Sequence, residues 1–139
     1  MTMQVSAEEY LVALREMLEA VRQLPQQPGT IVGIKRSGLI PAVFPSEKLK
    51  LPMLVDSELK QREALPTTPV LVVDTTYWTG KSLRKTVARL RRLGISDGQI
   101  FTLVAYQRRD AQPQEENHRA LALVDTIPVF WYQHSPQDE

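Results

Sequence analysis

The stretch Val70–Arg84, VLVVDTTYWTGKSLR, decides the fold. It begins with four apolar residues between Pro69 and Asp74, the pattern of a short strand that is covered on both faces in a parallel sheet. Small and hydroxyl-bearing residues at 79–82 then lead into a helix. Unpaired N–H groups and the positive end of the helix dipole meet at such a helix start. The stretch therefore predicts a strand, a turn and a helix whose first turn binds an anion, phosphate above all.

The rest of the chain alternates between helical and strand patterns. Apolar residues at helical spacing predict helices over about 7–24, 39–51 and 81–93. Ser6 and Glu9 form a capping box before the first helix, and Pro45 is expected to kink or shorten the second. Short apolar runs predict strands over 30–34, 52–55, 70–73, 100–105, 120–124 and 129–132. Polar segments predict loops over 56–68, which we expect to be mobile, and over 106–119.

This alternation predicts an α/β fold with a mainly parallel, twisted sheet flanked by helices, because parallel neighbours require crossover connections. With 139 residues the chain fits one domain, with an N-terminal helix and linker over 1–29 and a core over 30–133. The chain has no cysteine, which excludes disulfides and thiolate chemistry, and residues 1–9 do not read as a signal peptide. We expect a cytoplasmic protein without a membrane span, and the net charge of +1 gives no global attraction to nucleic acid.

Gly80-Lys81-Ser82 suggests a nucleotide-hydrolase phosphate loop, but that loop needs a glycine five residues before its Gly-Lys pair, where this chain has Thr75. The glycine pair Gly33 and Gly38 has the correct interval but lacks the lysine and hydroxyl residue that should follow. An ATPase or a kinase is therefore not supported. From spacing alone, Asp74–Ser82 could equally be an ordinary turn between a strand and a helix.

Two motifs, which follow one another along the chain, favour a ligand site over an ordinary turn. The first is GIKRSGLIPA from Gly33 after one predicted strand, and the second is VLVVDTTYWTGKS from Val70 after another. Together they resemble the type I phosphoribosyltransferase family, over most of the chain from Thr30 to about Gln133. The likeness is nearest to the purine-salvage members, with a degenerate second motif.

The resemblance implies a role for each motif. The second motif would bind the 5-phosphate of phosphoribosyl pyrophosphate (PRPP) through Thr76, Tyr77, Trp78, Thr79, Gly80, Lys81 and Ser82. The first would contact the pyrophosphate through Lys35, Arg36, Ser37 and Gly38. Asp74 and Thr75 would be catalytic and hold the ribose hydroxyls, and Asp74 would contact Mg²⁺ through water. Phe130 and Trp131 occupy the region where purine-salvage members stack the nucleobase, although aromatic residues on a terminal strand more often belong to the core.

Three departures from the family pattern bear on activity. The family usually has two adjacent carboxylates, whereas here Asp74 is followed by Thr75, which removes one charge that would stabilise a cationic sugar. Trp78 stands where purine-using members often carry an acidic residue, and an indole cannot act as a general base. Residues 56–68 are short for a lid that excludes water. Tyr77 and Trp78 are expected to be exposed and to cover a ligand or contact a partner subunit.

Two hypotheses follow from the resemblance. The first is a Mg²⁺-dependent phosphoribosyltransferase that joins a nucleobase to PRPP, with a homodimer expected from the habit of the family. The second is a binding or regulatory protein that keeps the fold but has lost catalysis. A third, a nucleic-acid-binding module, depends only on the basic residues of the helix over 81–93, which more simply complement the helix dipole. His118 and His134 lack metal-ligand spacing and receive no role.

Overall fold

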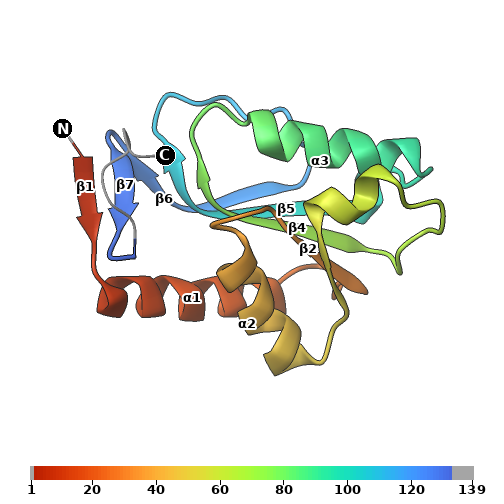
Figure 1. The fold of residues 1–139 in the computed structure, drawn as a ribbon, viewed down its shortest axis with the longest axis horizontal. Coiled ribbons are helices and arrows are strands. Elements are labelled where there is room, and N and C mark those ends of the chain that lie inside the picture. The colour runs from red at the N-terminus through yellow and green to blue at the C-terminus, as the bar shows by residue number, and fades with distance from the viewer. Residues whose placement is uncertain (1, 133–139) are drawn as a thin grey trace.

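The computed structural model describes residues 2–132, which form a three-layer α/β arrangement (Figure 1). The helices are α1 (Ala7–Arg22), α2 (Leu39–Leu49) and α3 (Lys81–Arg92), with short 3-10 helices η1 (Asp56–Lys60) and η2 (Asp97–Gln99). The strands are β1 (Thr2–Val5), β2 (Thr30–Gly33), β3 (Met53–Val55), β4 (Val70–Tyr77), β5 (Ile100–Arg108), β6 (His118–Val124) and β7 (Ile127–Phe130). No helix within these residues is both long and apolar enough to span a bilayer.

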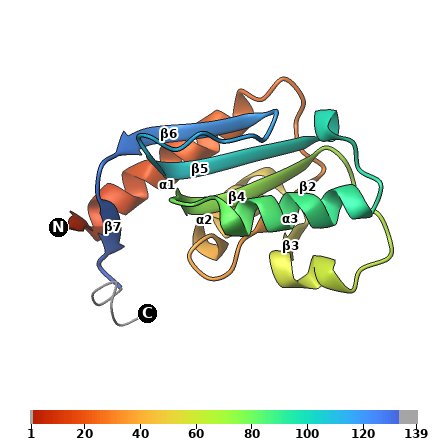
Figure 2. The same cartoon turned by 90° about the horizontal axis from the view of Figure 1, so that it is seen from above.

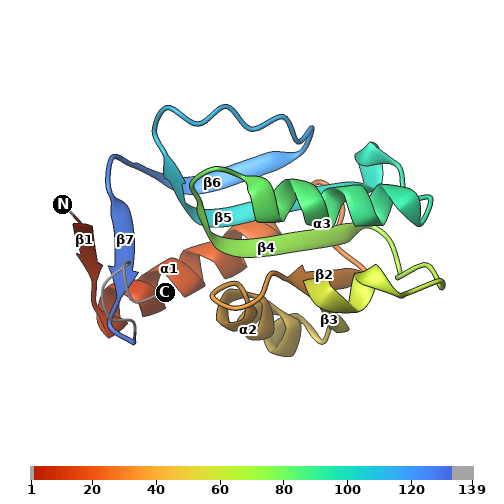
Figure 3. The same ribbon diagram turned by 45° about the horizontal axis from the view of Figure 1, so that its top comes forward.

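A five-stranded sheet of order β3-β2-β4-β5-β6 forms the middle layer, and every neighbouring pair in it is parallel. Helices α1 and α2 cover one face, and α3 covers the other together with η1 (Figures 1 and 3). The predicted α/β class with a parallel sheet flanked by helices is therefore confirmed.

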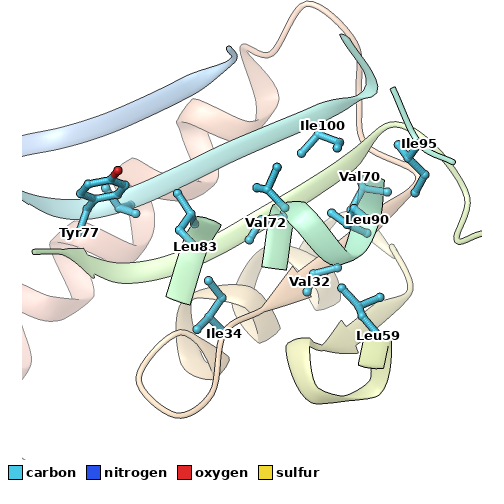
Figure 4. Packing of buried hydrophobic residues seen from close by; sticks show 12 residues of the cluster. Val32, Ile34, Leu59, Val70, Val72, Tyr77, Leu83, Leu90, Ile95 and Ile100 are labelled. Carbon is cyan, nitrogen blue, oxygen red and sulfur yellow. The ribbon is translucent and has the colours of Figure 1, made fainter. Parts of the chain in front are cut away.

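The sheet separates two apolar clusters. On the α3 face, Val72 of β4 packs with Leu83 and Leu90 of α3 (Figure 4). On the other face, Leu71 and Val73 of β4 pack against α1 and α2. All four residues of β4 from Val70 to Val73 are fully buried. Burial on both faces explains why this strand is an unbroken apolar run rather than an alternating one.

A second, two-stranded parallel sheet pairs β1 with β7 beside the main sheet (Figures 1 and 3), and Figure 2 shows β7 at the end of the main sheet. Val5 from β1, Tyr10 and Leu14 from α1, and Phe130 from β7 form its buried cluster. We refer to this assembly of β1, β7 and the start of α1 as the side sheet. The sequence did not predict β1, because a four-residue segment with one central polar residue carries little strand signal of its own.

Three predicted boundaries needed corrections that share one cause, and the strand predicted over 129–132 is observed two residues earlier, as β7. Strand β4 does not end at Val73 but continues through Tyr77, where it still pairs with β5. The predicted loop over 56–68 begins with η1, whose Leu59 is fully buried. The predicted loop over 106–119 is shorter, because β5 continues to Arg108 and β6 begins at His118. In each case pairing or packing with a distant segment orders residues that lack a local pattern.

One further local prediction is confirmed. Ser6 and Glu9 form the predicted capping box: Glu9 N–H donates to Ser6 Oγ at 3.1 Å, and Ser6 N–H donates to Glu9 Oε1 at 3.2 Å. Helix α2 continues through the buried Pro45 and ends before Lys50, which has a left-handed φ of 58°. Gln133, the predicted end of the core, and His134 lie outside the described residues.

Candidate functional site

Two turns meet at the carboxyl edge of the parallel sheet. The first, Lys35–Gly38, follows β2, and the second, Trp78–Gly80, follows β4. Strands β2 and β4 are direct neighbours, with Gly33 opposite Val73. In open α/β sheets, ligands bind in the crevice outside the carboxyl ends of the strands. The topology thus brings together the two motifs that the sequence keeps almost forty residues apart.

The first turn, Lys35–Gly38, is held by contacts at both ends. Lys35 N–H donates to the carboxylate Oδ1 of Asp56 at 3.0 Å, and Gly38 N–H donates to Ile34 O at 2.8 Å. The Lys35–Arg36 peptide bond is cis. A Cβ on Gly38 would lie 2.8 Å from Val73 O, so no larger residue fits between the turn and β4. The side chains of Lys35 and Arg36 are exposed, which leaves both cations free to face an anion.

Asp74 is the only carboxylate that the described part of β4 presents at this edge. Its Oδ1 accepts a hydrogen bond from Thr75 N–H at 2.7 Å and a long one from Ser37 Oγ at 3.5 Å. Burial, together with the nearby negative charge of Asp56, raises the pKa of Asp74 to about 7, although the hydrogen bonds from Thr75 and Ser37 oppose the shift. Asp74 is therefore poised to change its charge near neutral pH.

Thr75 stands where the family motif usually has a second carboxylate. The residue is only 1% exposed, and its Oγ1 donates to Ser37 O at 2.7 Å. The hydroxyl proton is thus already used to fix the first turn. An aspartate at this position could not make the same bond, because an ionised carboxylate only accepts hydrogen bonds.

The second turn depends on close packing. Gly80 has a φ of +79°, and a Cβ on it would collide with the Tyr77 ring. Arg84 Nη1 donates to Thr79 O at 2.9 Å, and Lys81 N–H reaches Thr79 Oγ1 at 3.4 Å. The side chains of Thr79, Lys81 and Ser82 are exposed around the start of α3. This arrangement offers backbone donors, hydroxyls and the positive end of a helix to one anion.

The prediction that Tyr77 and Trp78 are both exposed was wrong for Tyr77. Tyr77 is 3% exposed and packs in the cluster under α3, with its ring centroid 5.1 Å from that of His118 (Figure 4). Trp78 is half-buried, and the guanidinium of Arg108 lies 5.7 Å from its ring. Tyr77 therefore packs against the second turn from within the core, and its assignment to the 5-phosphate stays a prediction.

The two aromatic residues that the sequence analysis proposed for base stacking differ in how exposed they are. Phe130 is 3% exposed and meets Tyr10 edge-on, with ring centroids 5.2 Å apart, inside the side sheet. Trp131 is 52% exposed and also contacts Tyr10, at 5.2 Å. Of the two side chains, only that of Trp131 is exposed to solvent. The assignment of either residue to the nucleobase stays a prediction.

Sequence reasoning did not single out Asp56, and it explained the arginines of α3 only as a complement to the helix dipole. Asp56 was assigned to a loop, yet it contacts the first turn and acts electrostatically on Asp74. Arg89 Nη1 donates to Asp56 O at 3.2 Å, and Arg92 Nη2 donates to Leu59 O at 2.9 Å. These two cations therefore hold η1 against α3. An isolated Asp in a polar segment gives no local signal that could have revealed this contact.

The His118 ring lies within hydrogen-bonding distance of two side chains. Its Nδ1 lies 2.7 Å from Thr102 Oγ1, and its Nε2 lies 2.8 Å from Gln107 Oε1. Burial lowers the pKa of His118, which favours a neutral ring between these partners. Within residues 2–132, no group of three or more His, Asp or Glu side chains is arranged to hold a metal ion.

The carboxylates at the site are compatible with a Mg²⁺ ion that binds together with a phosphate ligand. Mg²⁺ usually retains several waters and is shared between one or two carboxylates and the phosphates of a substrate. Asp74 supplies one such carboxylate at the carboxyl edge, with Asp56 nearby. The residues thus suit an ion bound through water and a diphosphate, rather than an ion enclosed by protein ligands.

Comparison with known proteins addresses the fold. No protein-family model matches the sequence, and a search of curated proteins finds no significant match. Solved structures do match. Purine phosphoribosyltransferase from Pyrococcus horikoshii is 21% identical with a TM-score of 0.75, covering 97% of this chain and 96% of its own. Xanthine-guanine-hypoxanthine phosphoribosyltransferase from Helicobacter pylori is 20% identical with a TM-score of 0.76, covering 99% and 97%.

A third similar structure is a hypothetical protein from Neisseria gonorrhoeae with bound ppGpp. It is 15% identical with a TM-score of 0.75, covering 99% of this chain and 93% of its own. Adenine and orotate phosphoribosyltransferases also match, with TM-scores of 0.67 and 0.65. The five-stranded parallel sheet, the two turns at its carboxyl edge and these similarities together identify the fold of this chain as that of the type I phosphoribosyltransferases.

Proposed function

We propose that the protein binds PRPP or a nucleoside monophosphate across the two turns and transfers the phosphoribosyl group of PRPP to a nucleobase, releasing pyrophosphate. The observation that carries this proposal is the attachment of the first turn to β4. Thr75 Oγ1 donates to Ser37 O at 2.7 Å, and Ser37 Oγ lies 3.5 Å from Asp74 Oδ1. The basic turn is thereby fixed beside the carboxylate of β4, the strand that leads to the anion-binding helix start, as a diphosphate and a 5-phosphate on one sugar require.

Each part of the site would have a separate task. Backbone N–H groups and hydroxyls of residues 79–82 would bind the 5-phosphate. Lys35 and Arg36 would neutralise the departing diphosphate as the bond between the sugar carbon and its oxygen breaks. Asp74, in its ionised form, would stabilise the positive charge that develops on the sugar while the bond to the base nitrogen forms. Mg²⁺, when bound with the substrate, would neutralise part of the diphosphate charge.

The position of Thr75 refines this assignment. Its hydroxyl proton bonds Ser37 and the side chain is almost fully buried, which supports a positioning role for Thr75 and leaves Asp74 as the carboxylate that would act on the sugar. Asp74 would do so only above its pKa of about 7, because a protonated carboxyl carries no charge. Turnover is therefore expected to increase as the pH rises through 7.

Calorimetric titration with PRPP, with and without Mg²⁺, tests the binding part of the proposal. A turnover assay over purines and pyrimidines then tests the transfer. Asp74→Asn should reduce turnover much more than it reduces affinity for the 5-phosphate, since the substitution changes charge near the sugar rather than at the helix start. Equal losses in both quantities would contradict the role given to Asp74.

The second candidate is a ligand-binding or regulatory protein that has lost transfer activity. The segment between β3 and β4 favours it, because η1 is fastened to α3 by Arg89 and Arg92, and Thr67 O accepts a hydrogen bond from Thr30 Oγ1 at 2.7 Å, at the far end of β2. This segment does not stand over the site as a lid. The ppGpp bound to the similar Neisseria protein suggests ppGpp as a probe ligand. Binding without consumption of PRPP by any base would favour this candidate.

A homodimer is also part of the proposal. Exposed apolar side chains lie on α1 and α2, on the same side of the sheet (Figure 1), namely Leu11, Val12, Ile40 and Val43, which are 40–52% exposed. Burying such side chains against a second copy would stabilise an interface. Light scattering coupled to size-exclusion chromatography measures the mass directly, and a monomer at assay concentrations would contradict this part.

A further inference from the structure

Asp56 joins three separate parts of the molecule. It is half-buried at the start of η1, directly after β3. Its Oδ1 accepts a hydrogen bond from Lys35 N–H, 21 positions earlier in the chain, at 3.0 Å. Its main-chain oxygen accepts from Arg89 Nη1 of α3 at 3.2 Å. Asp56 therefore contacts the first turn through its carboxylate and α3, on the opposite side of the sheet from α2, through its main chain.

The segment that carries Asp56 is firmly anchored. Leu59 is fully buried in the cluster under α3, and Arg92 Nη2 donates to both Leu59 O and Lys60 O, at 2.9 and 3.3 Å. Val55 N–H donates to Glu58 Oε1 at 2.9 Å and closes the start of η1. Because its backbone is fixed on both sides, Asp56 offers the Lys35 amide an acceptor in a defined position.

The other end of the turn is fixed independently. Ser37 is held by Thr75 and lies beside Asp74, so both ends of Lys35–Gly38 are attached to neighbouring strands or to η1. Between these attachments, Lys35 and Arg36 direct two exposed cations into solvent.

We propose that Asp56 is a positioning residue for the pyrophosphate turn: its carboxylate fixes the Lys35 amide and thereby holds the Lys35–Arg36 pair ready for a diphosphate. The inference rests on the proposed function, because it takes the first turn as the diphosphate site. Asp56 needs no contact with the ligand. A turn that is already ordered loses less conformational freedom on binding, so its attachment should appear as affinity for diphosphate.

Two substitutions separate the hydrogen bond from the charge. Asp56→Asn keeps an oxygen that can accept from the Lys35 amide, whereas Asp56→Ala removes it. Asp97→Ala is the matched control, since Asp97 also begins a short 3-10 helix and its Oδ1 bonds Arg91 at 2.6 Å, away from the turn. All variants would be compared with the wild-type chain after thermal unfolding confirms that each is folded.

The first measurement needs no ligand. In an ¹⁵N-resolved NMR spectrum, the Lys35 amide proton should move upfield in Asp56→Ala and stay near its wild-type position in Asp56→Asn and Asp97→Ala. The second measurement is titration with inorganic pyrophosphate in the presence of Mg²⁺. Asp56→Ala should bind about tenfold more weakly, while Asp56→Asn stays within about threefold of wild type. Titration with inorganic phosphate, which reports on residues 79–82, should not change in any variant.

The outcomes distinguish the inference from the function on which it rests. If wild type fails to bind pyrophosphate, the proposed function is contradicted, and the Lys35 amide shift alone decides whether Asp56 fixes the turn. If wild type binds and Asp56→Ala binds equally well, or if its Lys35 amide does not move, the inference is overturned. Equal weakening of pyrophosphate and phosphate would also overturn it, because general damage to the fold would then explain the loss.

Discussion

The two turns at the carboxyl edge of the sheet are built in different ways. Lys35–Gly38 is fixed by polar side chains from other segments, namely Asp56, Asp74 and Thr75. The turn ahead of α3 is fixed by shape, with Gly80 at a φ of +79° against the Tyr77 ring. The first construction depends on charge, and the second depends on close contact.

This difference has consequences for stability and for binding. Packing is independent of pH, so the second turn should keep its form wherever the protein is folded. Polar contacts respond to protonation and to nearby charge, so the first turn should respond to pH and to the arrival of an anion. Gly80, which shapes the second turn, could be recognised in the sequence because it lies within the turn. The residues that hold the first turn lie in other segments, so no local pattern marks them.

The strongest test of the packed turn is Gly80→Ala. We expect a loss of about 3 kcal/mol in the free energy of unfolding, from a positive φ that costs roughly 1–2 kcal/mol and from overpacking against Tyr77. Urea denaturation measures it. Gly94→Ala is the matched control, because Gly94 has a φ of +96° but nothing within 4 Å of a Cβ, so it should lose only about 1 kcal/mol. Equal losses would show that close packing does not set the second turn apart.

The charge-dependent turn is tested by Asp74→Asn. The pKa of Asp74 rises from 3.8 to about 7 on folding, so the folded state is favoured when Asp74 is protonated. This contribution is present below pH 4 and is lost as the pH rises to 7. Asp74→Asn should therefore be more stable than wild type by about 2 kcal/mol at pH 8 and equally stable at pH 4. The expected gain is smaller than the pKa shift alone would give, because Asp74 is only half-buried and solvent screens its charge.

Urea denaturation at pH 4, 6 and 8 measures this difference between Asp74→Asn and wild type. Asp125→Asn provides the control, since Asp125 is exposed and pairs with Arg109 at 2.9 Å. Its stability should follow the wild-type profile. If Asp74→Asn also follows that profile, Asp74 does not make the first turn sensitive to pH.

Thr75→Val probes the hydrogen bond between β4 and the first turn. Valine keeps the volume of the side chain but leaves Ser37 O without its 2.7 Å partner, so we expect a loss of about 1.5 kcal/mol. Thr86→Val is the control in α3: Thr86 is equally buried, but its Oγ1 bonds Ser82 O within the same helix, and the loss should be smaller. Thermal unfolding ranks the two variants, and a larger loss for Thr86→Val would contradict the special position of Thr75.

The smallest effect is expected for Arg84→Ala. Arg84 is exposed and donates to Thr79 O at 2.9 Å, so its removal should change stability by less than about 0.5 kcal/mol but weaken phosphate binding about threefold. Lys85→Ala removes one positive charge from the next residue of α3 and controls for net charge. Titration with inorganic phosphate compares them, and equal weakening would assign the effect to charge rather than to the contact with Thr79.

The candidate site was predicted in outline. The capping box of α1 and the helix start at Lys81 follow from local patterns, and the structure confirms them. The exposure of Tyr77 was predicted wrongly, because the loop that was expected after Val73 is in fact strand as far as Tyr77. Asp56 was missed because its partner, the Lys35 amide, is a main-chain group that no residue pattern marks.

The sequence by itself determined the elements whose signals are local: the apolar run of β4, the helical spacing of α1 and α3, and a glycine at the positive φ before α3. Only the tertiary structure decided how Asp56, Asp74 and Thr75 share one turn, and how β1 pairs with β7 across the length of the chain. The physical reason is the range of the contacts. Periodicity and turn chemistry act over a few residues, whereas these hydrogen bonds join segments that meet only after the sheet has formed.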